Sequence, residues 1–252
     1  MWNLEGKTAL ITGGTKGIGR ATVLEFAKLG AKVIFTARDG AAVTAFQQEL
    51  GEMGYIASGM QGDVTSEDDQ DKLTDFVFQR SGSLDILVNN AGMNIRKEAI
   101  MYEVEEYEQV INTNLIAPFE LTRKFFALLK RSGKASVINV ASVAALQDVK
   151  SGAPYAMAKA GILQQTRSLA SEWADKNIRV NAISPWYTET PLVKPIIDQK
   201  ERYAKIVERT PLNRFAQPEE IASAIAFLAM DKASYITGQN ITADGGLSAN
   251  AL

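Results

Sequence analysis

A tyrosine and a lysine one helical turn apart are the residues of this sequence most clearly spaced for acid–base chemistry. Tyr155 and Lys159 stand at positions i and i+4 of a predicted helix and therefore share one face. An ammonium group near a phenol favours the phenolate, so we expect Lys159 to lower the pKa of Tyr155 from its usual value of about 10. Such a pair could transfer a proton near neutral pH. A surface tyrosine and lysine on an amphipathic helix would explain the same spacing taken alone.

A serine upstream could bind the oxygen atom that gains charge during the reaction. Ser142 ends the apolar run 136–142, thirteen residues before Tyr155. When a ketone is reduced, its oxygen becomes alkoxide-like, and hydroxyl donors from Ser142 and Tyr155 would stabilise that charge. A strand-end cap is the alternative explanation for Ser142. The chain contains no histidine and no cysteine, and we predict no metal site.

The composition is that of an ordinary globular protein. The chain has 252 residues, of which 46% are hydrophobic and 22% charged, with a net charge of −2. No basic stripe is visible, which argues against nucleic acid or a membrane as a partner. The N-terminus lacks a signal pattern, and the longest apolar helical stretch, 221–230, is too short to span a bilayer. We therefore expect a cytoplasmic protein.

Short apolar runs alternate with longer helical patterns along the whole chain. This alternation predicts right-handed βαβ crossovers, and the continuous apolar runs predict strands buried on both faces. We expect an α/β fold with one dinucleotide-binding and catalytic domain over residues 1–252, a doubly wound (Rossmann-like) sheet of about seven parallel strands with helices on both faces. The strands are expected at 7–12, 32–36, 55–60, 85–88, 135–140, 179–184 and 239–242, and the helices at 17–29, 41–53, 66–80, 104–131, 154–176 and 218–230.

One long connection interrupts this alternation. Residues 187–217 contain several prolines together with apolar residues. Connections of this length are usually functional. The segment therefore predicts a partly helical substrate lid.

A glycine-rich turn follows the first predicted strand. Glycines in such a turn let the backbone approach a pyrophosphate, whose charge meets a helix N-terminus. The spacing here is G-x-x-x-G-x-G, a variant of the dinucleotide-binding fingerprint. Because the turn lies between a strand and a helix, it predicts a nucleotide site. Its contacting residues are Gly13, Thr15, Lys16, Gly17, Ile18 and Gly19.

The chain resembles the short-chain dehydrogenase/reductase family over essentially its whole length. The resemblance rests on the glycine turn, on Asn89-Asn-Ala-Gly92 after the fourth strand, and on the ordered set Asn114, Ser142, Tyr155 and Lys159. It implies that Tyr155 is the acid/base and that Lys159 lowers its pKa and binds the nicotinamide ribose. Ser142 would bind the substrate oxygen, and Asn114 would anchor a water in a proton relay. The C-terminal half is similar to tropinone-reductase-like members.

The resemblance also implies cofactor contacts outside the glycine turn. These residues are Asp63, Val64, Asn89, Ala91, Gly92, Pro185, Trp186, Thr188 and Thr190. Family members generally have glycine where this chain has Trp186. We expect this side chain to wall the substrate pocket, with packing inside the lid as the alternative.

The end of the second strand predicts which dinucleotide is used. NAD-specific sites usually place an acidic residue there, whereas this strand is followed by Arg38. Arg38 could bind a 2′-phosphate, and Lys16 adds a second positive charge. Asp39 is expected to point elsewhere. We therefore predict NADP(H), although each basic residue alone could be a solvated loop charge.

The substrate pocket is expected to be largely apolar, and it is expected to lack the clustered basic residues that a carboxylate or phosphate would need. We predict a small neutral cyclic or aryl ketone, with a 3-oxoacyl-carrier-protein-type reductase or a catalytically idle NADP-binding scaffold as alternatives. Arg96 and Lys97, expected at the pocket mouth, keep the carrier alternative open. The resemblance implies a homotetramer. The expected lining residues are Met93, Asn94, Ala144, Leu146, Met157, Trp186, Tyr187 and Leu192.

Overall fold

The computed structural model describes residues 2–250, and its centre is one seven-stranded parallel sheet. The strand order is β3-β2-β1-β4-β5-β6-β7, so the chain moves outward from β1 in one direction and then returns to build the other half. This order confirms the predicted doubly wound fold. The strands are β1 (Thr8–Thr12), β2 (Lys32–Ala37), β3 (Ala57–Gln61), β4 (Ile86–Asn89), β5 (Ala135–Val140), β6 (Ile178–Pro185) and β7 (Asn240–Ala243).

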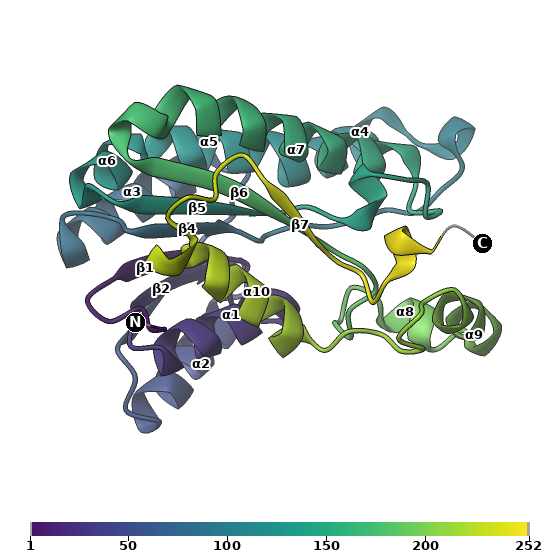
Figure 1. Ribbon diagram of the computed structural model, residues 1–252, viewed down its shortest axis with the longest axis horizontal. Helices are drawn as coiled ribbons and strands as arrows, with labels where there is room; N and C mark the ends of the chain where they lie inside the picture. Colours follow the sequence, from purple (N-terminus) through teal and green to yellow (C-terminus); the bar gives the residue numbers. More distant parts are fainter. Residues whose placement is uncertain (1, 251–252) are drawn as a thin grey trace.

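Helices cover both faces of the sheet, as the continuous apolar strands predict (Figure 1). One face carries α1 (Gly17–Lys28), α2 (Gly40–Glu52) and α10 (Pro218–Ala229). Phe26 and Ile225 are fully buried in the core beneath them. The other face carries α3 (Glu67–Ser81), α4 (Val104–Ile111), α5 (Ala117–Lys124), α6 (Phe126–Ser132) and α7 (Ala153–Trp173). Its core includes the fully buried Phe125.

The helix predicted at 104–131 is not continuous. Residues Asn112–Ile116 form a π-helical turn between α4 and α5. Pro118 accounts for the change, because it has no backbone N–H to donate to the carbonyl of Asn114 four residues earlier, as an α-helix requires. Single π turns often occur at functional sites, and this one carries a predicted catalytic residue.

The segment 187–217 contains the short helices α8 (Lys194–Ile197) and α9 (Lys200–Glu208). They lie at one end of the sheet, apart from the two helical layers (Figure 1). Their small core is formed by Tyr187, Val193, Ile196 and Phe215. In the part of the chain that the structure describes, no helix is long and apolar enough to cross a membrane.

Candidate active site

A cavity of about 470 Å³ extends along the carboxyl ends of the central strands. In doubly wound sheets this edge binds ligands at the point where the strand order reverses, here between β1 and β4. The cavity is bounded by the glycine turn, the loops after β2 to β6 and the start of the 187–217 segment. The four predicted catalytic residues all line it: Asn114, Ser142, Tyr155 and Lys159.

The glycine turn packs too closely to accept side chains at two of its positions. A Cβ added to Gly19 would lie 2.1 Å from the carbonyl oxygen of Gly13. Gly17 has a φ of +53°, and its Cβ would lie 2.9 Å from Cγ2 of Thr190. The turn can therefore present backbone N–H groups and the N-terminus of α1 to a pyrophosphate. Thr15, Lys16, Gly17 and Ile18 line the cavity, whereas Gly19 is buried behind them.

The end of β2 suits a 2′-phosphate. Arg38 and Lys16 are exposed at the cavity edge. Oδ1 of Asp39 accepts a hydrogen bond from the Ala42 N–H at 3.0 Å and caps α2, so its carboxylate is engaged elsewhere, as expected. The buried hydroxyl of Thr36, which lines the same region, has no hydrogen-bond partner within residues 2–250. These groups fit a phosphorylated ribose.

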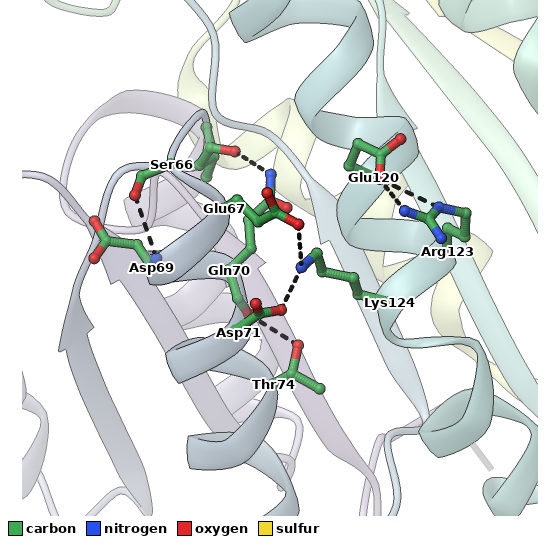
Figure 2. Close-up of polar contacts among 10 residues, drawn as sticks. Ser66, Glu67, Asp69, Gln70, Asp71, Thr74, Glu120, Arg123 and Lys124 are labelled. Carbon is green, nitrogen blue, oxygen red and sulfur yellow. Dashed lines mark hydrogen bonds and ion pairs between the residues drawn. The ribbon is translucent and has the colours of Figure 1, made fainter.

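The loop carrying Asp63 and Val64 is fixed by the first turn of α3, whose N-cap Ser66 and residues Asp69 and Gln70 are drawn in Figure 2. The Asp63 N–H donates to Oδ2 of Asp69 at 2.8 Å, and Nε2 of Gln70 donates to the Val64 carbonyl at 2.7 Å. Lys124 reaches from α5 to acidic residues of α3, including Asp71, and ties the two helices together. Both loop residues line the cavity where the adenine is expected.

The two asparagines after β4 have different roles. Asn89 does not line the cavity; its buried Nδ2 donates to Oγ1 of Thr122 at 2.9 Å and to Oδ1 of Asn139 at 2.8 Å. Asn90, which the sequence analysis did not single out, donates from Nδ2 to the carbonyls of Thr12 and Gly13. It therefore braces the glycine turn. Ala91 and Gly92 line the cavity as expected.

The hydroxyl of Ser142 is oriented by its own backbone. Its Oγ accepts a hydrogen bond from the Ala144 N–H at 3.1 Å. The same hydroxyl faces Tyr155, where its hydrogen bond lowers the pKa of the phenol, and it lines the cavity in which a substrate oxygen would lie. Ser142 also caps the short 3₁₀ turn that follows β5, so the capping role and the predicted binding role are compatible.

The electrostatic surroundings of Tyr155 differ from the expectation. Burial raises the pKa of Tyr155, and the effects that lower it come from the Ser142 side chain and the positive charge of Arg96. Lys159 was expected to lower this pKa. In the structure its Nζ donates to the carbonyl of Val140 at 2.8 Å and lies over the Tyr155 ring, 5.6 Å from the ring centroid. Burial also lowers the pKa of Lys159 to about 8.

Asn114 joins the π-helical turn to the loop after β4. Its buried Nδ2 donates to the carbonyls of Met93 and Val110, both at 2.8 Å. A Cβ on Gly92 would lie 2.8 Å from Oδ1 of Asn114 and 3.7 Å from Nζ of Lys159. The three predicted site residues Gly92, Asn114 and Lys159 therefore converge, although they come from three separate elements.

Half of the predicted substrate-pocket residues line the cavity, namely Met93, Trp186, Tyr187 and Leu192. The others, Asn94, Ala144, Leu146 and Met157, are not in its lining. Met157, two positions after Tyr155 on α7, points away because residues two apart lie on different sides of a helix; it is 63% exposed. Leu146 is also exposed.

Trp186 has both of the roles that the sequence left as alternatives: it lines the pocket, and it packs against the 187–217 segment. It lines the cavity together with Pro185, Thr188 and Thr190. Its Nε1 also donates to Oγ1 of Thr210, just after α9, at 3.0 Å, and its ring meets Tyr187 edge-on at 4.6 Å. The indole therefore attaches the 187–217 segment to the end of β6 while forming part of the pocket wall.

The cavity lining also contains residues that were not expected there, among them Arg96, Val149 and Ser151. Arg96 was considered only at the pocket mouth, as a possible contact for a carrier protein. The sequence alone offered no indication that its loop turns inward.

Comparison with known proteins agrees with this geometry. A family model described as enoyl-(acyl carrier protein) reductase matches residues 13–248. A tropinone reductase homolog of Arabidopsis thaliana is 44% identical over 99% of this chain and 95% of its own length. Among solved structures, a putative NAD(P)-dependent gluconate 5-dehydrogenase of Beutenbergia cavernae with bound NADP superposes with a TM-score of 0.94, at 33% identity and 99% coverage of both chains.

A gluconate 5-dehydrogenase of Burkholderia cenocepacia, in complex with NADP and tartrate, superposes with a TM-score of 0.95 at 28% identity, covering 99% of this chain and 98% of its own. This chain belongs to the short-chain dehydrogenase/reductase family, as the sequence motifs predict.

Proposed function

We propose that the protein is an NADPH-dependent carbonyl reductase, working reversibly as an alcohol dehydrogenase, with Tyr155 as its acid/base. Family membership makes it an NADP-dependent oxidoreductase. The observation that carries the proposal is the convergence of Tyr155, Ser142, Lys159 and Asn114 on the cavity that also contains the glycine turn. Four residues from three segments, the π-helical turn, the end of β5 and α7, would not be expected to meet at a nucleotide site by chance.

The chain's own groups would act on the carbonyl oxygen. NADPH, when bound, supplies the hydride. Ser142 and Tyr155 would donate hydrogen bonds to the substrate oxygen as it gains charge, and Tyr155 would then give up its proton. The raised pKa of Tyr155 keeps its phenol protonated at neutral pH, which suits a proton donor in the direction of reduction. Lys159, whose pKa burial lowers to about 8, would return a proton to Tyr155 and regain one from solvent through a water anchored by Asn114.

The cofactor is NADP(H), and two of the similar solved structures contain bound NADP. Arg38 and Lys16 would bind its 2′-phosphate, with Asp39 held away by its capping bond. We expect Arg38→Asp to reverse the preference toward NADH, because a carboxylate repels the phosphate and accepts hydrogen bonds from ribose hydroxyls. The measurement is kcat/KM for NADPH and NADH. An unchanged ratio would contradict this assignment.

The substrate is proposed to be a small cyclic or aryl ketone covered by a lid at residues 187–217. Trp186, Tyr187 and Leu192 would form the apolar wall of the pocket. The sequence favoured a neutral compound because no cation was expected inside the pocket. Arg96 lines the cavity, so that reason no longer holds.

Turnover with a panel of compounds tests the proposal. The purified protein is mixed with NADPH and with cyclic ketones, aryl ketones and 3-oxoacyl thioesters, and NADPH oxidation is followed at 340 nm, the absorbance of reduced nicotinamide. Reduction of one or more ketones would support the proposed function. Reduction of thioesters alone would indicate the carrier-protein alternative. Tight NADPH binding without any turnover would indicate the idle scaffold.

We also propose that the protein is a homotetramer in the cytoplasm. Apolar side chains on α4 and at the start of α5 are exposed in the single chain, among them Val104, Tyr107 and Phe119. Burial of such side chains between subunits would remove them from water.

A further inference from the structure

Arg96 brings a positive charge into the substrate end of the cavity. It follows β4 in the loop that also carries Met93, and it lines the same cavity as Tyr155 and Ser142. Its Nε is buried and has no hydrogen-bond partner, and within residues 2–250 its guanidinium makes no ion pair. Arg96 as a whole is half-buried, but its buried Nε–H is a donor of a charged group without a partner, which favours a ligand with a hydrogen-bond acceptor at this position.

The loop around Arg96 is held on both sides. The Tyr102 hydroxyl donates to the carbonyl of Ile95 at 2.6 Å and accepts from the Lys97 N–H at 3.2 Å. One residue earlier, Nδ2 of Asn94 donates to the carbonyl of Ser151 at 3.0 Å. A Cβ on Gly152 would lie 2.2 Å from the Tyr102 hydroxyl, so glycine is needed for this close packing. Arg96 is therefore presented from a braced backbone.

The acidic residues that line the cavity are not available to Arg96. Asp39 and Asp63 lie at the predicted adenosine end, where Asp39 caps α2 and Asp63 accepts hydrogen bonds from Thr65. The neighbouring Lys97 is already paired with Glu106 at 2.6 Å, and it is not in the cavity lining. Among the described residues, two cations line the substrate end without an ion pair: Lys159, whose Nζ donates to the Val140 carbonyl at 2.8 Å, and Arg96. Arg96 is the one that the proposed proton transfer does not use.

We infer that the substrate is a small oxocarboxylate, whose carboxylate pairs with Arg96 while its carbonyl oxygen faces Tyr155 and Ser142. This inference rests on the proposed function and specifies its substrate class. A guanidinium binds a carboxylate through two parallel hydrogen bonds, a geometry that also orients the bound molecule. Arg96 would therefore determine both charge selectivity and the position of the carbonyl. It also influences Tyr155 directly, since its charge lowers the pKa of that phenol.

Matched substrates test the inference. We would compare 4-oxocyclohexanecarboxylate with its methyl ester, which keeps the ring and ketone but removes the charge. The wild type should reduce the acid with the higher kcat/KM. Arg96→Gln should raise KM for the acid by about 10- to 100-fold, the usual effect of losing a charge-assisted hydrogen bond, and change KM for the ester by less than about 3-fold. Arg96→Lys should restore part of the loss.

Arg131→Gln is the matched control, because Arg131 is an exposed arginine on α6 outside the cavity. It should leave both substrates unaffected. Equal use of acid and ester by the wild type, or equal losses for both in Arg96→Gln, would overturn the inference while leaving the proposed reductase function in place.

A binding measurement separates failure of the inference from failure of the proposed function. Cyclohexanecarboxylate and cyclohexanecarboxamide are titrated calorimetrically into the protein saturated with NADP⁺. Selective binding of the carboxylate, lost in Arg96→Gln, would support the anion site even if no ketone were reduced. Absence of that selectivity would overturn it even if ketones were reduced.

Discussion

At the scale of single residues, the groups proposed to do the chemistry are held in conditions that cost stability. Lys159 is only 5% exposed, and burial lowers its pKa from 10.5 to about 8. At neutral pH the folded protein must therefore keep an ammonium group buried and poorly hydrated, whereas the unfolded chain exposes that group to water. Such costs at functional positions are expected where a site is selected for activity.

Replacing this lysine should therefore stabilise the protein. Lys159→Met should raise the free energy of unfolding at pH 7 by up to about 3 kcal/mol, the upper limit set by the pKa difference. The gain should shrink as pH rises from about 8 toward 10.5, because the folded lysine loses its proton in this range and the wild type no longer has to bury a charge. Urea unfolding at pH 7 and pH 10 measures both effects. A variant less stable than the wild type at pH 7 would contradict this account of Lys159.

The sequence predicted that Asn114, Ser142, Tyr155 and Lys159 share one site, and they line one cavity, but it did not predict their electrostatics. The family resemblance singled out the four residues, and each follows or lies within a recognisable element. The positive charge that lowers the pKa of Tyr155 belongs instead to Arg96, which lies on an irregular loop. The path of this loop depends on contacts such as the hydrogen bonds of the Tyr102 hydroxyl. The periodicity of the sequence does not indicate which residues form such contacts.

At the scale of elements, the glycine turn joins β1, α1 and the start of the 187–217 segment in one closely packed unit. Gly19 has no room for a methyl group, whereas Gly51, near the end of α2, has no atom within 4 Å of an added Cβ among the described residues. These two helical glycines therefore form a matched pair for mutation.

Gly19→Ala should push apart the turn and lower NADPH affinity by at least about 10-fold, because the backbone must move away from the pyrophosphate site. Gly51→Ala should leave NADPH affinity unchanged and stabilise α2 by about 0.5–1 kcal/mol. Fluorescence titration with NADPH and thermal unfolding measure these quantities. Equal NADPH affinity in Gly19→Ala and the wild type would show that the turn does not bind the cofactor.

The strands and most helices were predictable because their apolar runs and caps are local signals. The helix predicted at 66–80 begins where Ser66 caps α3, with its Oγ accepting from the Asp69 N–H at 3.3 Å. The π-helical turn at 112–116 was not predicted, since an apolar pattern of helical period continues across it. Pro118 was the available signal, and its effect on the Asn114 carbonyl follows from helix geometry.

At the scale of the whole molecule, the exposed apolar side chains of α4 and α5 favour assembly. Tyr107 and Phe119 are 39% and 40% exposed, and Ile116 between them is 45% exposed. A monomer rarely leaves so many large apolar side chains in one region in contact with water.

We expect sedimentation velocity at micromolar concentration to give one species of about four times the chain mass of 27.4 kDa. Tyr107→Glu combined with Phe119→Glu should dissociate it, because charges would be buried at the subunit contact. The control is a double substitution outside these helices, Glu25→Gln with Lys28→Gln, at a half-buried and an exposed residue of α1. A monomeric wild type would contradict the proposed tetramer.

The most direct measurement of the proposed chemistry is the hydride-transfer rate of Tyr155→Phe in stopped flow, with NADPH bound to saturation before a reducible ketone is added. Removing the hydroxyl takes away the proton donor but leaves the ring, so NADPH affinity should change by less than about 3-fold while the rate falls by about 1000-fold or more. A rate within about 10-fold of the wild type, at the same NADPH occupancy, would contradict the assignment of Tyr155 as the acid/base.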